Sequence, residues 1–144
     1  MINDWGEWVP GVRLLELQRL EDNRGWFLKV LKRDQLVKST AEFGEIYISS
    51  GKPGAFKGGH YHSRTTEWFL VIKGEARFWC KPDNSEEWRT MILKDRKPVL
   101  IEVCPGICHA FENVKTSQLL VLAYCNEPYN PNDPDTFPVP LPQK

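Results

Sequence analysis

The three histidines of the chain fall in two short segments, each with spacing that suits a metal site. His60 and His62 stand two residues apart, so on a β-strand their imidazoles project from the same face. Glu67 follows after a short bend, and His109 follows a Pro-Gly turn in the second segment. Three neutral imidazoles and one carboxylate suit divalent transition metals and leave a coordination position for water or substrate. We therefore expect one divalent ion at His60, His62, Glu67 and His109, with zinc preferred over iron, nickel or manganese.

Short apolar runs separated by turn residues predict that β-strands position these ligands. Eleven prolines and ten glycines punctuate the chain. The clearest hairpin joins Trp68–Ile72 to Glu75–Trp79 through Lys73 and Gly74. Only Lys32–Phe43 has a weak helical pattern, and we expect one short turn of helix there at most. The predicted strands are Val12–Leu20, Trp26–Leu31, Glu45–Ser50, Glu67–Ile72, Glu75–Cys80, Trp88–Leu93, Val99–Val103, His109–Asn113 and Leu119–Tyr124.

The chain length and amino-acid composition indicate one domain of ordinary globular composition, spanning residues 1–144. Nineteen basic and nineteen acidic residues balance, which argues against nucleic-acid binding. There is no membrane-length apolar run and no signal-peptide pattern at the start, so we expect a cytoplasmic protein with four reduced cysteines. The tail, residues 127–144, holds six prolines and is expected to lie extended over the barrel or to add an edge strand.

The two histidine segments resemble the two motifs of the cupin superfamily. The matching positions are His60, His62, Glu67, Gly74, Gly106, His109 and Asn113. The resemblance implies an all-β, single-domain cupin, which is a double-stranded β-helix or jelly-roll barrel. It also supports the four-ligand metal site, although Pro105 directly precedes Gly106, one residue later than the cupin motif places it.

Two further segments narrow the resemblance. Residues 22–27, Asp-Asn-Arg-Gly-Trp-Phe, resemble the D-X-R-G-X-F signature of dTDP-4-dehydrorhamnose 3,5-epimerases. Residues 126–136, together with the His60–Gly74 block, resemble the metal-binding cupin domain at the C-terminus of bifunctional capsular-polysaccharide nucleotide-sugar enzymes. The implied function is epimerisation or isomerisation of a nucleotide-linked keto sugar in surface-polysaccharide biosynthesis, by a homodimer.

The resemblance also implies site roles. Arg24 would contact the nucleotide diphosphate, often across a dimer interface, although a solvated charge beside a turn is an equal alternative. Lys57 stands at a phosphate-binding arginine position of the epimerases, and Arg64 and Arg77 would complete a basic pocket. Lys57 and Tyr124 are the candidates for proton transfer.

Two departures keep other functions open. Ala123 stands where the epimerases carry their acidic tyrosine, and His60, at the position of their base, is expected to bind metal instead. A non-catalytic sugar- or metabolite-binding cupin is therefore one alternative. An iron-dependent cupin dioxygenase is another, and it requires an open, mostly apolar pocket.

Overall fold

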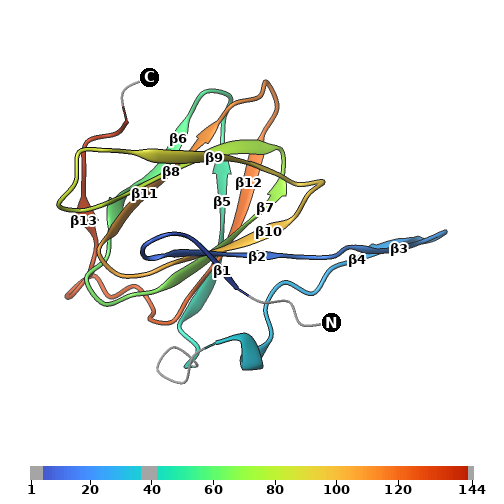
Figure 1. Ribbon diagram of the computed structural model, residues 1–144, viewed down its shortest axis with the longest axis horizontal. Helices are drawn as coiled ribbons and strands as arrows, with labels where there is room; N and C mark the ends of the chain where they lie inside the picture. Colours follow the sequence, from blue (N-terminus) through green and yellow to red (C-terminus); the bar gives the residue numbers. More distant parts are fainter. Residues whose placement is uncertain (1–4, 37–41, 143–144) are drawn as a thin grey trace.

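Two antiparallel sheets face each other across an apolar core in the computed structural model, which describes residues 5–36 and 42–142 (Figure 1). The six-stranded sheet has the order β1-β2-β10-β7-β12-β5, and the five-stranded sheet has the order β13-β6-β11-β8-β9. A two-stranded ribbon, β3-β4, stands apart from both sheets. The strands are β1 Gly6–Val9, β2 Val12–Glu16, β3 Leu20–Asp22, β4 Gly25–Phe27, β5 Glu45–Gly51, β6 Phe56–Tyr61, β7 Glu67–Lys73, β8 Glu75–Pro82, β9 Arg89–Lys94, β10 Val99–Val103, β11 Ile107–Asn113, β12 Leu119–Cys125 and β13 Phe137–Pro138.

Alternating side chains of the facing strands build the core. In β12 every second residue from Leu119 to Cys125 is buried, as expected for a strand with one face turned inward. The core between the sheets includes Phe69, Val71, Phe78, Phe111 and Val121. The pattern confirms the predicted all-β barrel.

Strand β7 is buried on both of its faces. Trp68 and Leu70 turn away from the barrel interior into a second cluster, against which Leu28, Val30 and Leu31 pack. The chain between β4 and β5 therefore covers the outer face of the six-stranded sheet. This cover explains why β7 reads as a continuous apolar run instead of an alternating one.

Several boundaries differ from the sequence expectation. Val12–Leu20 divides into β2 and β3, and the Trp26–Leu31 strand shortens to Gly25–Phe27. In the Lys32–Phe43 region the structure describes a three-residue 3-10 helix at Arg33–Gln35, while residues 37–41 lie outside the described residues.

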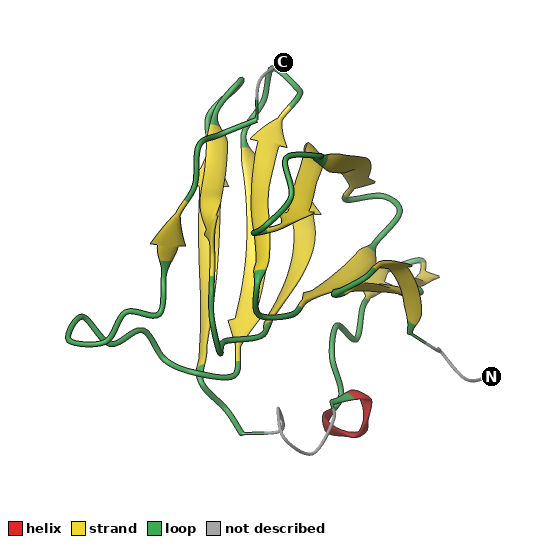
Figure 2. Ribbon diagram, turned by 60° about the vertical axis from the view of Figure 1, so that its left-hand side comes forward, coloured by secondary structure: helices red, strands yellow, loops and turns green. Residues whose placement is uncertain are grey.

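Strands β1, β6 and β13 were not predicted as separate strands. β13 follows the long loop after β12 and pairs antiparallel with β6, so the proline-rich tail does add an edge strand (Figure 2). The sequence pattern did not predict β6, because this strand contains Gly58 and Gly59 and lacks an apolar alternation. This unpredicted strand carries the first metal-ligand candidate, His60.

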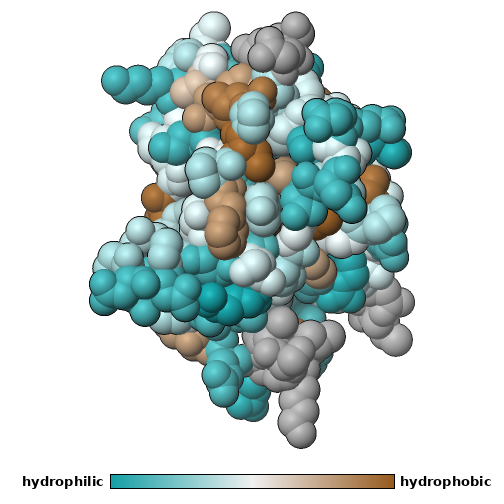
Figure 3. All heavy atoms as spheres, turned by 90° about the vertical axis from the view of Figure 1, so that its left-hand side faces the viewer, coloured by the Kyte–Doolittle hydropathy of each residue, from teal (hydrophilic) through white to brown (hydrophobic). Residues whose placement is uncertain are grey.

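No helix in residues 5–36 or 42–142 is long and apolar enough to cross a membrane. The face on the β13 side of the molecule is largely hydrophilic, with its largest group of hydrophobic side chains in the upper centre and smaller ones scattered around it (Figure 3). The four cysteines, all in the described part of the chain, form no disulfide. This agrees with the expectation of reduced thiols.

Candidate metal centre

The four predicted ligands converge between the two sheets. β6 supplies His60, the turn after it supplies His62, β7 supplies Glu67 and β11 supplies His109. Each offers one ligand atom, and these four atoms lie within 4.8 Å of one another. The sequence prediction that these side chains meet at one point agrees with the geometry.

A β-bulge in β6 sets the direction of the first two ligands. His60 pairs with His109 and Gly58 pairs with Ala110, so Gly59 is the extra residue between them. Both glycines have positive φ values, +90° at Gly58 and +85° at Gly59. A Cβ at Gly59 would lie 2.8 Å from the end of the Leu141 side chain, which would have to move, and the positive φ itself favours glycine there.

Backbone carbonyls orient two of the imidazoles. Nδ1 of His62 lies 2.7 Å from the carbonyl oxygen of Asp135, and Nδ1 of His109 lies 3.0 Å from the carbonyl oxygen of Ile107. A carbonyl oxygen only accepts hydrogen bonds, so each Nδ1 carries a proton, and in the neutral ring Nε2 is then the atom free to bind an ion. Those Nε2 atoms lie 2.6 Å (His62) and 3.1 Å (His109) from Oε1 of Glu67.

The second oxygen of Glu67 is occupied by protein donors. The Tyr47 hydroxyl donates to Oε2 at 3.0 Å, and the Cys125 thiol donates to the same oxygen at 3.2 Å. Burial and the Glu67 charge raise the pKa of both donors, so both keep their protons at neutral pH. Glu67 therefore presents Oε1 to the histidines and holds Oε2 away from them.

The donor set fits a divalent ion. Nε2 of His109 is buried and makes no hydrogen bond within the described part of the chain, which is costly for a polar atom unless something else binds it. Burial lowers the pKa of His60 to about 4, and repulsion from His109 and His62 contributes, so His60 is a neutral ligand at pH 7. Burial would raise the pKa of Glu67, but its close contacts with His109 and His62 hold that pKa well below its usual range. One carboxylate with neutral imidazoles is a common zinc ligand set.

Two cavities flank the cluster. A cavity of about 310 Å³ is lined by His60, His62 and Glu67 and by the C-terminal segment after β12. A cavity of about 160 Å³ reaches His60 and His109 from the other side. Besides Gly58 and the two histidines, its lining residues are Tyr47, Ser49, Lys57, Phe69, Phe111 and Val121. A small molecule entering either cavity meets the ligand cluster.

Of the residues assigned to catalysis, the structure brings Lys57 to the centre and leaves Tyr124 outside. Lys57 lines the smaller cavity together with His60 and His109. Tyr124 lies on the outer face of β12, where its ring packs on Trp68 and its hydroxyl donates to the carbonyl oxygen of Glu42 at 2.9 Å. The strand alternation that turns Cys125 toward Glu67 turns Tyr124 away from it.

The predicted basic pocket of Arg24, Lys57, Arg64 and Arg77 does not assemble around the cluster within the described chain. Arg64 lines the larger cavity, but it forms ion pairs with Glu127 and Asp133. Arg77 pairs with Glu112. The rim of the larger cavity is instead acidic, because Glu45 also lines it.

Arg24 lies at the turn of the β3-β4 ribbon, which projects away from the two sheets (Figure 1). Its guanidinium pairs with Asp22 at 2.6 Å, and its side chain is 86% exposed. Within one chain it therefore lies outside both cavities that flank the ligand cluster.

Sequence reasoning missed three residues of the centre: Tyr47, Cys125 and Asp135. Tyr47 pairs in register with Ala123, so its phenol stands on the strand next to the position that lacks the epimerase tyrosine. The apolar alternation of β5 would have placed Ile46 and Ile48 inward, but both are exposed in the structure and Tyr47 contacts Glu67 instead, so this sequence signal was misleading. No comparable local signal marks Asp135, which lies in an irregular segment far from the ligands in sequence.

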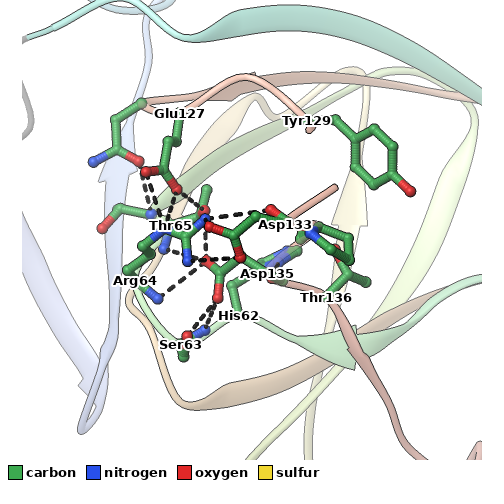
Figure 4. Close-up of polar contacts among 12 residues, drawn as sticks. His62, Ser63, Arg64, Thr65, Glu127, Tyr129, Asp133, Asp135 and Thr136 are labelled. Carbon is green, nitrogen blue, oxygen red and sulfur yellow. Dashed lines mark hydrogen bonds and ion pairs between the residues drawn. The ribbon is translucent and has the colours of Figure 1, made fainter. Parts of the chain in front are cut away.

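The buried Asp135 carboxylate is charged. Burial acts to raise the pKa of its carboxyl, but hydrogen bonds from Ser63, Thr65 and the Arg64 backbone hold that pKa well below the usual range. These donors surround both of its oxygens (Figure 4).

Comparisons with known proteins agree with this architecture. The family described as "Polysaccharide biosynthesis C-terminal domain" matches residues 20–137. The chain is 35% identical over 116 residues to the UDP-2-acetamido-2,6-beta-L-arabino-hexul-4-ose reductase of Pseudomonas aeruginosa strain PA103. This match covers 81% of the chain but only 29% of the reductase, so the chain spans less than a third of that relative.

Solved structures show the same fold. The capsular polysaccharide assembling protein CapF from Staphylococcus aureus is similar with a TM-score of 0.67 and 26% identity, over 87% of this chain and 33% of CapF. A dTDP sugar isomerase from Desulfovibrio desulfuricans G20 is similar with a TM-score of 0.79 and 23% identity, over 92% of this chain and 85% of the isomerase. The second likeness extends over almost the whole of both chains and confirms the cupin fold.

Proposed function

The chain belongs to the polysaccharide biosynthesis C-terminal domain family, and from this premise we propose that it is a metal-binding cupin that epimerises or isomerises a nucleotide-linked keto sugar. The pathway would be the synthesis of a surface polysaccharide. The observation that carries the proposal is the convergence of three histidines and Glu67 between two cavities. The reductase relative and the sugar isomerase neighbour are named for nucleotide-linked sugars, which supports the substrate class.

The reaction has two chemical requirements. Changing the configuration of a carbon beside a ketone needs removal of a weakly acidic proton and stabilisation of the negative charge that develops on the carbonyl oxygen. A divalent ion held by His60, His62, Glu67 and His109 would supply Lewis acidity toward that oxygen. The protein must then supply the group that moves the proton.

We propose Lys57 as the residue that moves the proton. It lines the cavity that reaches His60 and His109, and the apolar side chains of Phe69, Phe111 and Val121 form part of the same wall. Its amine is the group from this wall that can exchange a proton with a substrate carbon held near the ion. We assign Lys57 this role in place of Tyr124.

The first experiment combines metal analysis with isotope exchange. Protein purified without added metal is expected to contain nearly one equivalent of zinc, nickel, iron or manganese, and the His62→Ala variant is expected to lose it. Wild-type protein incubated in D₂O with UDP- or dTDP-linked 4-keto sugars is expected to introduce deuterium beside the ketone. Lys57→Met should keep the metal and lose at least about 100-fold in exchange rate, the lower end for general acid–base catalysis.

Lys52→Met is the matched control, because Lys52 is an exposed lysine outside both cavities. Unchanged exchange in Lys57→Met would remove Lys57 from the mechanism. Metal-free wild-type protein, with a His62→Ala variant of equal stability, would refute the four-ligand site.

A non-catalytic sugar-binding cupin is the second candidate. The outward position of Tyr124 and the alanine at position 123 favour it, because both leave the centre without the tyrosine that the epimerase resemblance implies. Saturable binding of a nucleotide sugar without deuterium exchange would support this candidate over the enzyme.

A further inference from the structure

Asp135 forms an unusual concentration of hydrogen bonds beside the metal centre. It lies in the irregular segment between β12 and β13, is 5% exposed and has a φ of +47°. Both carboxylate oxygens accept hydrogen bonds from one short stretch of chain (Figure 4). The donors to Oδ1 are the Ser63 N–H at 2.8 Å and the Ser63 hydroxyl at 2.5 Å, and the donors to Oδ2 are the Arg64 N–H at 3.1 Å, the Thr65 N–H at 3.0 Å and the Thr65 hydroxyl at 2.8 Å.

The backbone of Asp135 reaches the metal ligand directly. Its carbonyl oxygen accepts the Nδ1–H of His62 at 2.7 Å. Asp135 therefore holds four consecutive residues, 62 to 65, through its side chain and its carbonyl. These residues form the connection from His62 to Glu67, so a single residue determines how two of the four ligands are joined.

The segment that carries Asp135 is itself anchored. Directly after it, Phe137 pairs with Tyr61 and Pro138 pairs with His60 in the β13-β6 ladder. The Val139 N–H then donates to the carbonyl oxygen of Gly59 at 2.9 Å. Before Asp135, the side chain of Asn126 accepts from the Thr66 N–H at 3.0 Å. The segment is thus held on both sides of Asp135 by the same part of the chain that carries the ligands.

From these contacts we propose that Asp135 is a positioning residue of the metal centre, which fixes the tautomer of His62 and the path from His62 to Glu67 before an ion binds. The proposal rests on the proposed metal site and adds a residue to it. An outer-shell partner of this kind raises affinity because the ligands lose little conformational freedom when the ion arrives. The connection itself has no regular backbone pairing at residues 62–66, so the Asp135 hydrogen bonds replace the order that a strand would provide.

Nearby acidic residues do not have this arrangement. Asp133 and Glu127 bind Arg64 on the exposed side of the connection, and their side chains are 63% and 41% exposed. Exposed ion pairs contribute little free energy, so their loss should leave the ligands in place. Asp133 is therefore a matched control: the same residue type, in the same segment, acting on the same connection.

The test compares Asp135→Asn, Asp135→Gly and Asp133→Asn with the wild-type protein. Asparagine and glycine both tolerate the positive φ, so neither variant strains the backbone. The zinc dissociation constant is measured by competition with a chelating dye, and the visible spectrum is recorded with saturating cobalt(II). Asp135→Asn should weaken zinc binding about 10- to 100-fold, the range typical of outer-shell partners of metal ligands, and alter the cobalt bands at saturation.

The other two variants are a deletion of the carboxylate and a control. Asp135→Gly loses the carboxylate and keeps the carbonyl that binds His62, so it should weaken zinc binding through the connection. Asp133→Asn should bind zinc within about threefold of wild type, as expected for loss of an exposed ion pair, with unchanged cobalt bands. A purely structural role for Asp135 would lower the melting temperature of the metal-free protein but leave the cobalt spectrum at saturation unaltered.

Asp135→Asn and wild type with equal zinc affinity and equal cobalt spectra would overturn this proposal alone. Wild-type protein that binds neither zinc nor cobalt would overturn the metal site and this proposal together. If the Asp135 variants fail to fold, the double variant Ser63→Ala/Thr65→Val removes two of the donors and leaves Asp135 in place. It should weaken zinc binding in the same direction, and unchanged affinity in this variant would also reject the proposal.

Discussion

At the scale of single residues, the centre depends on groups that bind the ligands as much as on the ligands themselves. Tyr47 and Cys125 occupy one oxygen of Glu67, Ile107 orients His109 and Asp135 orients His62. Each of these partners holds a ligand atom toward a common point. Metal affinity should therefore respond to residues that never touch the ion.

Tyr47→Phe tests this dependence at Glu67. The substitution keeps the ring but removes the hydroxyl that donates to Oε2 at 3.0 Å, so Glu67 can rotate. We expect zinc affinity to fall about tenfold, at the low end for an outer-shell partner because Cys125 still donates, as measured by chelator competition.

The control for Tyr47→Phe is Tyr61→Phe. The Tyr61 ring stacks on Phe137 with centroids 5.2 Å apart, and its sequence position is between His60 and His62. Removing its hydroxyl should leave zinc affinity unchanged. Equal losses in the two variants, or none in either, would contradict the assignment of Tyr47 to Glu67.

At the scale of elements, a bulge in β6 directly precedes His60, the ligand on that strand, and His62 follows in the turn after it. Gly54 and Gly59 both have positive φ values, +77° and +85°, but only Gly59 is crowded. A Cβ at Gly54 meets nothing within 4 Å, whereas one at Gly59 lies 2.8 Å from Leu141. Alanine substitutions at Gly54 and Gly59 therefore separate the cost of backbone strain from the cost of the added contact with Leu141.

Gly59→Ala should therefore lose more stability than Gly54→Ala. We expect Gly54→Ala to cost about 1 kcal/mol of unfolding free energy from the left-handed backbone alone, and Gly59→Ala to cost at least about 2 kcal/mol. Only Gly59→Ala should also weaken zinc binding, because His60 follows it directly. Urea unfolding and zinc titration measure the two effects, and equal losses from both variants would show that the bulge is not crowded.

Some of the strands and ligands could be predicted from the sequence, and others could not. The three histidine ligands were predictable because the chain has three histidines in two short segments, and Glu67 was predictable from its spacing after His62. β8 and β12 were predictable because β8 alternates apolar and polar residues and β12 is a short continuous apolar run. β6 was not, because its inward direction comes from two glycines and a bulge that only pairing with β11 reveals.

The contacts of the C-terminal segment lay beyond sequence reasoning. Asp135 is irregular in structure and far from His62 and Ser63 in sequence, so no local pattern predicts that they meet. The ion pairs of Arg64 with Glu127 and Asp133 were equally hidden, and they removed Arg64 from the predicted basic pocket. The positions of Asp135 and Arg64 depend on tertiary contacts of irregular segments, and hydrophobic periodicity does not predict such contacts.

At the scale of the whole molecule, the β3-β4 ribbon exposes apolar side chains that one copy of the chain leaves uncovered. Leu20, Trp26 and Phe27 are 59%, 56% and 57% exposed on a ribbon that belongs to neither large sheet. An isolated two-stranded ribbon is marginally stable in water, and apolar side chains exposed together indicate an interaction surface. We propose that this ribbon contributes to the expected homodimer.

Phe27→Asp tests the dimer. Light scattering after size-exclusion chromatography should give a dimer for the wild type and a monomer for this variant, because a buried charge without a partner is strongly unfavourable. Ile92→Asp is the control, since Ile92 is an exposed apolar residue of β9 in the five-stranded sheet. A monomeric wild type, or an unaffected Phe27→Asp dimer, would remove the ribbon from the interface.

The place of Asp135 in the chain has a consequence for biosynthesis. Asp135 comes later in the sequence than every metal ligand, so a ribosome completes the ligand set before it adds the residue proposed to position it. On that proposal a nascent chain would hold metal loosely and exchange ions with its surroundings until the segment that carries Asp135 docks beside β6. Tight binding of one ion would then wait for the pairing of β13 with β6, and the rate of that pairing would set when the ion is retained.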